Sequence, residues 1–272
     1  MVVQPEHIQW LVDTEQRLQT SDGRSVEVWE FCHQPDDRIL SAWAKHFRNH
    51  YCPDRQIDQL RQGTGLSRRD YLINLKFPDR VTAPGPSIRS GDFGEILVAD
   101  FLEFKLGFWV PRTHYSNKAI RNESTKGCDI IGIRFFREET TSPQDMLAVF
   151  EAKAQLSGLM ANSRLQDAVD GSCKDLTRKA DTLNAMKQRF LDAREDDAAF
   201  RVERFQDPED RPYREISGAA VICATPLYSP SMIRTVDTSR HPNQDNLRLI
   251  VFCGKNLMDL VHELYRRAAD EA

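Results

Sequence analysis

The sequence predicts an α/β fold in which a mixed central sheet is flanked by helices on both faces. Apolar residues recur at helical spacing between Phe93 and Phe104, where a core helix is expected. Near-continuous apolar runs at 219–224 and 247–252 are typical of strands buried on both faces. From Ser90 onward the predicted order is helix, three strands, helix, strand, strand, helix, which builds a sheet covered by helices.

Residues 1–86 are predicted to form an α+β addition of mixed helices and a strand. The segment VTAPGP at 81–86 breaks regular structure and marks the proposed boundary with a main domain at 87–272. The addition either covers the sheet or forms a partner interface. Its expected elements are an amphipathic start through Ile8, Leu11 and Leu18, a strand at Val26–Phe31, a helix capped by Asp36 or Asp37, and a short helix near Ile57 and Leu60.

The main domain is expected to open with a helix that Ser90 caps and Gly107 ends. Gly94 would let this helix approach the sheet closely, despite the cost of about 1 kcal/mol for a glycine within a helix. The three strands that follow are predicted at Phe108–Val110, Cys128–Phe136 and Met146–Ala154, with a charged turn at Pro143 before the last.

A long helix is predicted from Arg164 to Arg194, with Gly171 as a possible interruption. The polar segment 196–214 is expected to be a charged loop or a helix extension. After the two buried strands, Asn256 opens a final amphipathic helix.

Composition excludes several classes of protein. The 272 residues are 40% hydrophobic and 29% charged, which is ordinary for a globular chain. No run approaches the roughly 20 apolar residues of a membrane span, and the N-terminus lacks a secretory signal, so we expect a cytoplasmic protein with six reduced cysteines. The net charge of −4 disfavours a surface that grips nucleic acid throughout, but allows a local basic groove.

Glu151 and Lys153 carry the strongest functional signal. They lie two residues apart in VFEAKA, an otherwise apolar strand segment, so they share one face. A buried carboxylate and ammonium are costly unless they pair or meet a metal ion. The alternative is a surface ion pair on an edge strand.

Asp129 begins the preceding predicted strand, and a hairpin would bring it beside Glu151. Together with the backbone carbonyl of Ala152 they would form an oxygen site suited to Mg²⁺, or to Mn²⁺ as a substitute. Glu95, in GDFGE, would support the same site directly or through water. The alternatives are a turn role for Asp129 and, for a first-turn Glu95, a favourable interaction with the helix dipole.

These residues suit phosphodiester hydrolysis. A bound divalent cation would polarise the phosphoryl oxygen and lower the pKa of a water, while Lys153 would orient that water or stabilise the negative transition state. The predicted catalytic set is Glu95, Asp129, Glu151 and Lys153. One or two metal ions remain open.

Candidate contacts to DNA phosphates are weaker. Basic residues gather in and beside the polar loop before Cys128, and Lys174 lies with Asp170 and Asp175 on the following helix. Each of these could equally be a solvated charge. The loop residues concerned are Arg112, Lys118, Arg121 and Lys126.

Two further features of the sequence give weaker indications of function. His46 and His50 stand one helical turn apart, but no cysteine or acidic residue accompanies them at a known zinc spacing, so core packing or exposure is expected. The chain has no GxxxxGK[ST] loop, so ATP binding is not expected.

Gly94-Glu95, Cys128-Asp129 and Glu151-Ala152-Lys153 resemble the helix Glu, strand Asp and ExK motifs of the PD-(D/E)xK superfamily over about residues 90–252. Cys128 replaces the usual proline before the Asp. The contexts GDFGE, KGCDIIGI and FEAK further resemble the HamA family, the nuclease subunits of the Hachiman antiphage system. This resemblance implies a restriction-endonuclease-like core and a Mg²⁺-dependent nuclease that acts on DNA with a helicase partner.

The sequence therefore favours a metal-dependent DNA endonuclease of a prokaryotic antiviral system. The alternative is a nuclease-fold adaptor that binds DNA or a helicase without cleaving. The form of the DNA, the cleavage pattern, the oligomeric state and the activation signal stay open.

Overall fold

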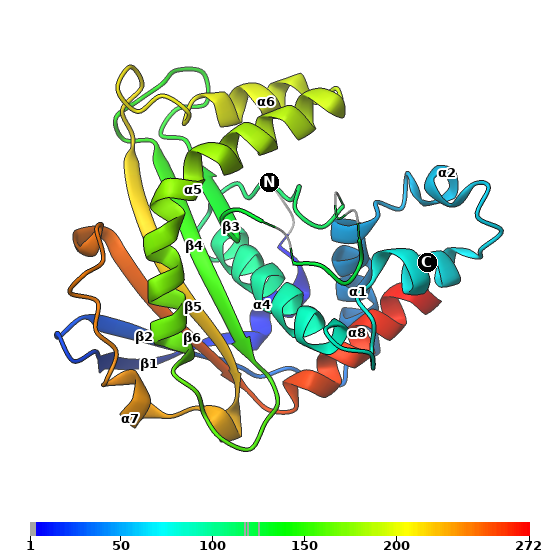
Figure 1. Ribbon diagram of the computed structural model, residues 1–272, viewed down its shortest axis with the longest axis horizontal. Helices are drawn as coiled ribbons and strands as arrows, with labels where there is room; N and C mark the ends of the chain where they lie inside the picture. The colour runs from blue at the N-terminus through cyan, green and yellow to red at the C-terminus, as the bar shows by residue number, and fades with distance from the viewer. Residues whose placement is uncertain (1–3, 117, 119, 125) are drawn as a thin grey trace.

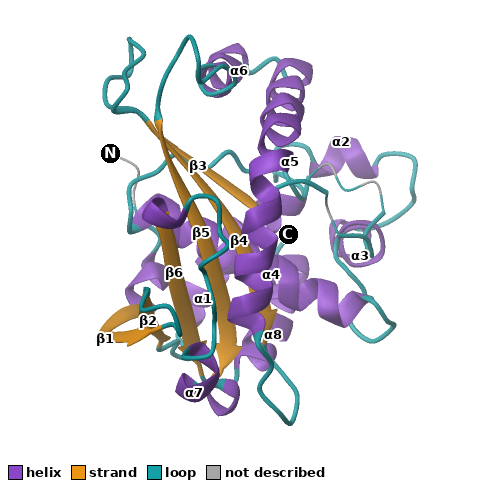
Figure 2. Ribbon diagram, turned by 60° about the vertical axis from the view of Figure 1, so that its left-hand side comes forward, coloured by secondary structure: helices purple, strands orange, loops and turns teal. Residues whose placement is uncertain are grey.

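The computed structural model describes residues 4–116, 118, 120–124 and 126–272. Six strands form one mixed sheet in the order β1-β2-β6-β5-β4-β3, with helices on both faces, as predicted (Figures 1 and 2). The strands are β1 (Leu11–Gln19), β2 (Ser25–Phe31), β3 (Ile130–Arg134), β4 (Met146–Gln155), β5 (Arg214–Ala224) and β6 (Leu247–Gly254). The α-helices are α1 (Asp37–Tyr51), α2 (Ile57–Arg61), α3 (Arg68–Tyr71), α4 (Gly85–Phe104), α5 (Arg164–Asp192), α6 (Asp196–Glu203), α7 (Pro230–Ile233) and α8 (Leu257–Asp270). Short 3-10 turns lie at Glu6–Trp10, Thr225–Leu227 and Gln244–Asn246, and a π turn lies at Leu72–Lys76.

The alternation of side chains along β4 divides the core between the two faces of the sheet. Phe150 and Ala152 face α4 and share a core with α1 and α8. Val149, one residue away, belongs to the core on the opposite face under α5 and α6. Figure 1 shows α5 lying across β4 and β5 on that face. Glu151 and Lys153 therefore point to the α5 side.

The strands that carry the candidate site are paired as the sequence predicted. β3 and β4 are antiparallel, with Ile130 opposite Phe150. β4, β5 and β6 are parallel, and the inner residues of β5 and β6 are mostly apolar on both faces. The first of the three predicted strands, Phe108–Val110, is reduced to a single bridge between Trp109 and Ile133.

The start of α4 was predicted wrongly. The helix begins at Gly85 rather than after Ser90, because Pro86 fits the first turn, where its missing N–H is not needed. Glu95 therefore lies in the middle of the helix, so the helix dipole does not explain it. Gly94 does lie close to the sheet: a Cβ there would be 3.2 Å from the Ala154 Cβ.

The N-terminal region contributes to the same sheet. β2 runs parallel to β6, with Val28 opposite Val251, and α1 packs on α8. Asp36 caps α1 by accepting a hydrogen bond from the Ile39 N–H at 3.0 Å. The amphipathic start became a 3-10 turn and β1. The domain boundary between residues 86 and 87 stays a prediction. Strands from both sides of it, β2 and β6, pair within one sheet.

The remaining predictions for the second half of the chain are mostly confirmed. α5 passes through Gly171 without interruption, and the charged segment after it contains α6, which packs on α5. All six cysteines are free thiols, four of them buried. Among the described residues, no helix is both long enough and apolar enough to cross a membrane.

Gly218 of β5 offers a test of this packing. A Cβ at Gly218 would lie 2.3 Å from two ring carbons of Phe150, a side chain that is 1% exposed. We expect Gly218→Ala to lower the free energy of unfolding by about 1–3 kcal/mol, because a buried ring must move. Urea unfolding would measure this, with Gly91→Ala, whose new methyl meets no atom within 4 Å, as the control. An unchanged midpoint for Gly218→Ala would contradict the described core.

Candidate active site

An open cleft of about 780 Å³ lies where β4 extends past the start of β3, under α5. The structure brings all four predicted catalytic residues to its lining: Glu95 from α4, Asp129 before β3, and Glu151 and Lys153 from β4. Asp129 and Glu151 come together because the antiparallel register that pairs Ile130 with Phe150 puts them opposite each other.

The segment before β3 is held by α5. Gly127 has a φ of +110°, a conformation that favours glycine. The next amide, the Cys128 N–H, donates to Thr182 Oγ1 at 3.0 Å. Asp129 Oδ2 then accepts a hydrogen bond from the Ala152 N–H at 3.0 Å. The Ala152 carbonyl leaves β4 on the same side as its N–H, so it also points toward Asp129.

Glu151 is the most buried acid of the predicted set, at 4% exposure. Its Oε1 accepts a hydrogen bond from Lys153 Nζ, while its Oε2 has no hydrogen-bond partner among the described residues. α5 comes so close that a Cβ at Gly171 would lie 2.5 Å from Glu151 Oε1. The surface ion pair considered above therefore does not describe Glu151.

The carboxylates repel one another. Burial and the Asp92 carboxylate raise the pKa of Glu95 to about 8, although Tyr115 OH donates a hydrogen bond to Glu95 Oε2 at 2.5 Å. Burial, followed by Glu95 and Glu151, raises the pKa of Asp129 well above its ordinary value. A divalent cation among these oxygens would relieve the repulsion.

Lys153 stays charged in this setting. Burial lowers its pKa, but the hydrogen bond to Glu151 and the charges of Glu151 and Asp129 outweigh burial, so the net shift is upward. A positive charge is therefore fixed beside the acids.

Sequence reasoning missed two neighbours of Glu95. Tyr115 is a hydrogen-bond donor to it, and His114 Nδ1 lies 3.8 Å from Glu95 Oε2. Burial and Arg189 lower the pKa of His114 to about 4, so its imidazole is neutral. His114 and Tyr115 lie in a loop about 20 residues after Glu95 in the sequence, and no local sequence pattern indicates that they contact it.

The predicted basic residues separate into two groups. Lys126, Lys174 and Arg178 are exposed on the cleft lining, and Arg189, which also lines the cleft, is half-buried. Arg121 instead donates to the Ile73 carbonyl at 2.7 Å and pairs with Asp79 at 3.0 Å, which ties the loop to the N-terminal region.

Arg112 and Lys118 also form ion pairs away from the cleft lining. Lys118 Nζ lies 2.6 Å from Asp92 Oδ2, and Arg112 Nη2 lies 2.7 Å from Asp100 Oδ1. Neither residue is a solvated loop charge.

His46 and His50 do have an acidic partner, contrary to the expectation from their spacing. Asp100 of α4 is fully buried, and its Oδ1 lies 2.9 Å from His46 Nε2. His46, His50 and Asp100 are close enough to hold a metal ion. However, Arg112 Nη1 lies 3.2 Å from His50 Nε2, and Arg112 also forms an ion pair with Asp100. The guanidinium group of Arg112 therefore already balances the negative charge of Asp100. The partner was missed because it lies 54 residues away.

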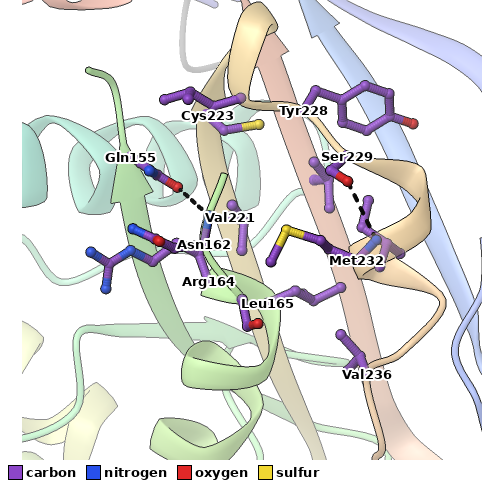
Figure 3. A pocket seen from close by; sticks show the side chains of 14 residues that line it. Gln155, Asn162, Arg164, Leu165, Val221, Cys223, Tyr228, Ser229, Met232 and Val236 are labelled. Atoms are coloured by element: carbon purple, nitrogen blue, oxygen red, sulfur yellow. Dashed lines mark hydrogen bonds between the residues drawn. The ribbon is translucent and has the colours of Figure 1, made fainter. Parts of the chain in front are cut away.

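A second, smaller and mostly apolar pocket lies at the carboxyl ends of the parallel strands. Figure 3 shows Val221, Leu165 and Met232 lining it, and its volume is only about 30 Å³. Among its polar groups, Gln155 Oε1 accepts from the Asn162 N–H at 3.0 Å. It offers no chemistry comparable to that of the cleft.

The sequence matches the HamA family over residues 6–268, nearly its whole length. The chain belongs to the HamA family. This membership suggests that the HamA-family protein described here is a component of the Hachiman antiphage defence system, which has more than one component. No curated protein matches the sequence.

The raised carboxyl pKa values of this HamA protein predict a pH effect on stability. The relevant range runs from about pH 6.5, above which the histidines of the unfolded chain are mostly neutral, to pH 8. In this range folded Glu95 holds a proton that the unfolded chain has released. The free energy of unfolding should therefore fall as pH rises through this range. Melting temperatures in EDTA would show the decline, and Mn²⁺ should reduce it. Glu95→Gln should flatten the EDTA profile, and a melting temperature that rises across the range would contradict the assignment.

Proposed function

We propose that this protein is a divalent-metal-dependent DNA endonuclease of the PD-(D/E)xK superfamily, and the effector of a Hachiman system that acts with a helicase partner. One observation carries the proposal: acids from α4, the start of β3 and β4 meet Lys153 in one open cleft. Glu151 is 4% exposed, and its Oε2 has no hydrogen-bond partner among the described residues. A buried oxygen of this kind is better explained as a cation ligand than as part of a structural acid.

Asp129, Glu151 and the Ala152 carbonyl would hold the ion, with Glu95 as a direct or water-mediated ligand. These are hard oxygen donors of the kind that Mg²⁺ and Mn²⁺ prefer. When bound, the cation would polarise the scissile phosphate and lower the pKa of a water molecule. Glu95 and Asp129 would position the phosphate through that ion.

Lys153 would place its ammonium beside the attacked phosphate, where negative charge develops. Its hydrogen bond to Glu151 fixes the direction of the side chain. The hydrogen bond from the Tyr115 hydroxyl holds Glu95 in place, with the neutral His114 beside it.

Exposed cations on the cleft lining would bind the DNA backbone. Lys126 lies just before β3 and Lys174 lies on α5, so two different segments supply these cations. A local basic rim of this kind is compatible with a net charge of −4, because phosphate contacts need charge only along the groove.

Metal removal tests the function directly. We expect the purified protein, combined with the helicase of its system, to degrade plasmid and linear DNA in Mg²⁺ or Mn²⁺, and to stop when EDTA is added. Restoring excess Mg²⁺ should restore cleavage, which controls for damage by the chelator. Cleavage that continues in EDTA would refute the metal-dependent mechanism. Binding of DNA or helicase without any cleavage in Mg²⁺ would instead indicate the adaptor.

A further inference from the structure

Asp175 of α5 is a buried acid without hydrogen-bond partners for its carboxylate. The residue is 1% exposed, and neither carboxylate oxygen has a hydrogen-bond partner among the described residues. The ion pair to Arg178 Nη1 spans 3.8 Å, which is too long for a hydrogen bond. A buried polar group in this condition costs free energy and calls for a compensating ligand.

The position of Asp175 relates it to the candidate metal ligands. It lies one helical turn after Gly171, the residue that packs directly on Glu151. Its backbone carbonyl accepts a weak hydrogen bond from Cys128 Sγ at 3.7 Å, and Cys128 precedes Asp129. α5 therefore carries Asp175 over the junction between Asp129 and Glu151.

The three carboxylates lie close enough to repel one another. Burial, then the charges of Glu151 and Asp129, raise the pKa of Asp175 to about 8.

Two other polar residues of α5 are paired. Thr182 Oγ1 donates to the Arg178 carbonyl at 2.9 Å, and Lys179 pairs with Glu215 across to β5. Asp175 differs from both because neither of its carboxylate oxygens has such a contact, and Glu151 Oε2 is likewise without a hydrogen-bond partner among the described residues.

We propose that Asp175 is a further ligand of the divalent-cation centre, joining Asp129 and Glu151 from the helix above them. The inference rests on the proposed function, because it assumes a cation at that site. It adds a ligand from α5, a helix that carries none of the four predicted catalytic residues. Carboxylate oxygens bind Mg²⁺ and Mn²⁺ at neutral pH in competition with protons.

Calorimetric titration of the full-length protein with Mn²⁺ alone tests this ligand. We expect Asp175→Asn to weaken Mn²⁺ binding about 10-fold or more. The matched control is Asp170→Asn, an exposed acid of the same helix that is bound to Gln166, and it should bind Mn²⁺ as the wild type does. In EDTA, Asp175→Asn should melt at a higher temperature than the wild type, because one of three repelling acids is gone. Its gain in melting temperature on adding Mn²⁺ should be smaller.

A comparison with Glu151→Gln separates this inference from the proposed function. If Glu151→Gln loses Mn²⁺ binding while Asp175→Asn keeps it, Asp175 is a structural acid and the metal centre stands. If the wild type and Glu151→Gln bind Mn²⁺ equally, or neither binds it, both proposals fail. Asp175→Ser, which is smaller and uncharged, provides the same comparison if the asparagine variant does not fold.

Discussion

Glu151→Gln is expected to reduce DNA cleavage by roughly 10³-fold or more, because it removes the anionic ligand at the centre of the site. The glutamine side chain has nearly the same shape, so it keeps the packing against Gly171. It also removes one charge from a group of acids that repel one another. The variant should therefore melt at the same or a higher temperature than the wild type in EDTA. Initial rates of plasmid cleavage, taken beside melting curves, measure both effects.

Glu139→Gln provides the matched control, since it makes the same chemical change at an exposed position between β3 and β4. It should cleave at the wild-type rate. Cleavage by Glu151→Gln within a few-fold of the wild type would remove this carboxylate from the mechanism. Lost cleavage together with a collapsed melting curve would mean that Glu151 supports the fold rather than the reaction.

Gly171→Ala should impair the same chemistry without touching a charged residue. The added methyl would lie 2.5 Å from Glu151 Oε1 and 2.6 Å from its Cδ, so the carboxylate must move. A displacement of about 1 Å in an active site can cost roughly 10²-fold in rate, and we expect a loss of that size. Because alanine favours the helical conformation over glycine, the melting temperature should change little. Cleavage rates and the Mn²⁺ affinity should fall together.

Gly91→Ala separates the effect of alanine on helix stability from the displacement of the Glu151 carboxylate. Gly91 also lies within an α-helix, α4, but a Cβ there meets no atom within 4 Å. This control should gain up to about 1 kcal/mol of stability and keep its activity. Wild-type cleavage by Gly171→Ala would show that Glu151 can occupy another position and still function.

Much of the fold could be predicted because the apolar patterns are strong. The parallel strands β5 and β6 are apolar on both faces, and α5 repeats apolar residues over eight turns. The start of α4 was missed because Ser90 is a good capping residue, whereas the actual start depends on Pro86 in the first turn. Local propensity cannot choose between two acceptable starts when tertiary packing favours the longer helix.

The geometry of the candidate site was predictable only where it depends on short-range rules. Glu151 and Lys153 share a face because strands alternate, and a hairpin places Asp129 opposite Glu151. The sequence does not decide whether Asp175 is a solvated helix charge, since its burial depends on where α5 crosses the sheet. The pairing of Arg112 with Asp100 likewise joins two elements, and nothing in the spacing of either residue signals it.

The parallel pairing of β2 with β6 joins residues near both ends of the chain. Val26 lies opposite Leu249, so this pairing forms only when residues more than 200 positions apart in the sequence come together. Such non-local contacts slow folding. A fragment without the first two strands would leave β6, with its apolar residues, as an uncovered edge strand, which invites aggregation. β1 and β2 therefore protect the edge of the sheet opposite to the strands that form the cleft.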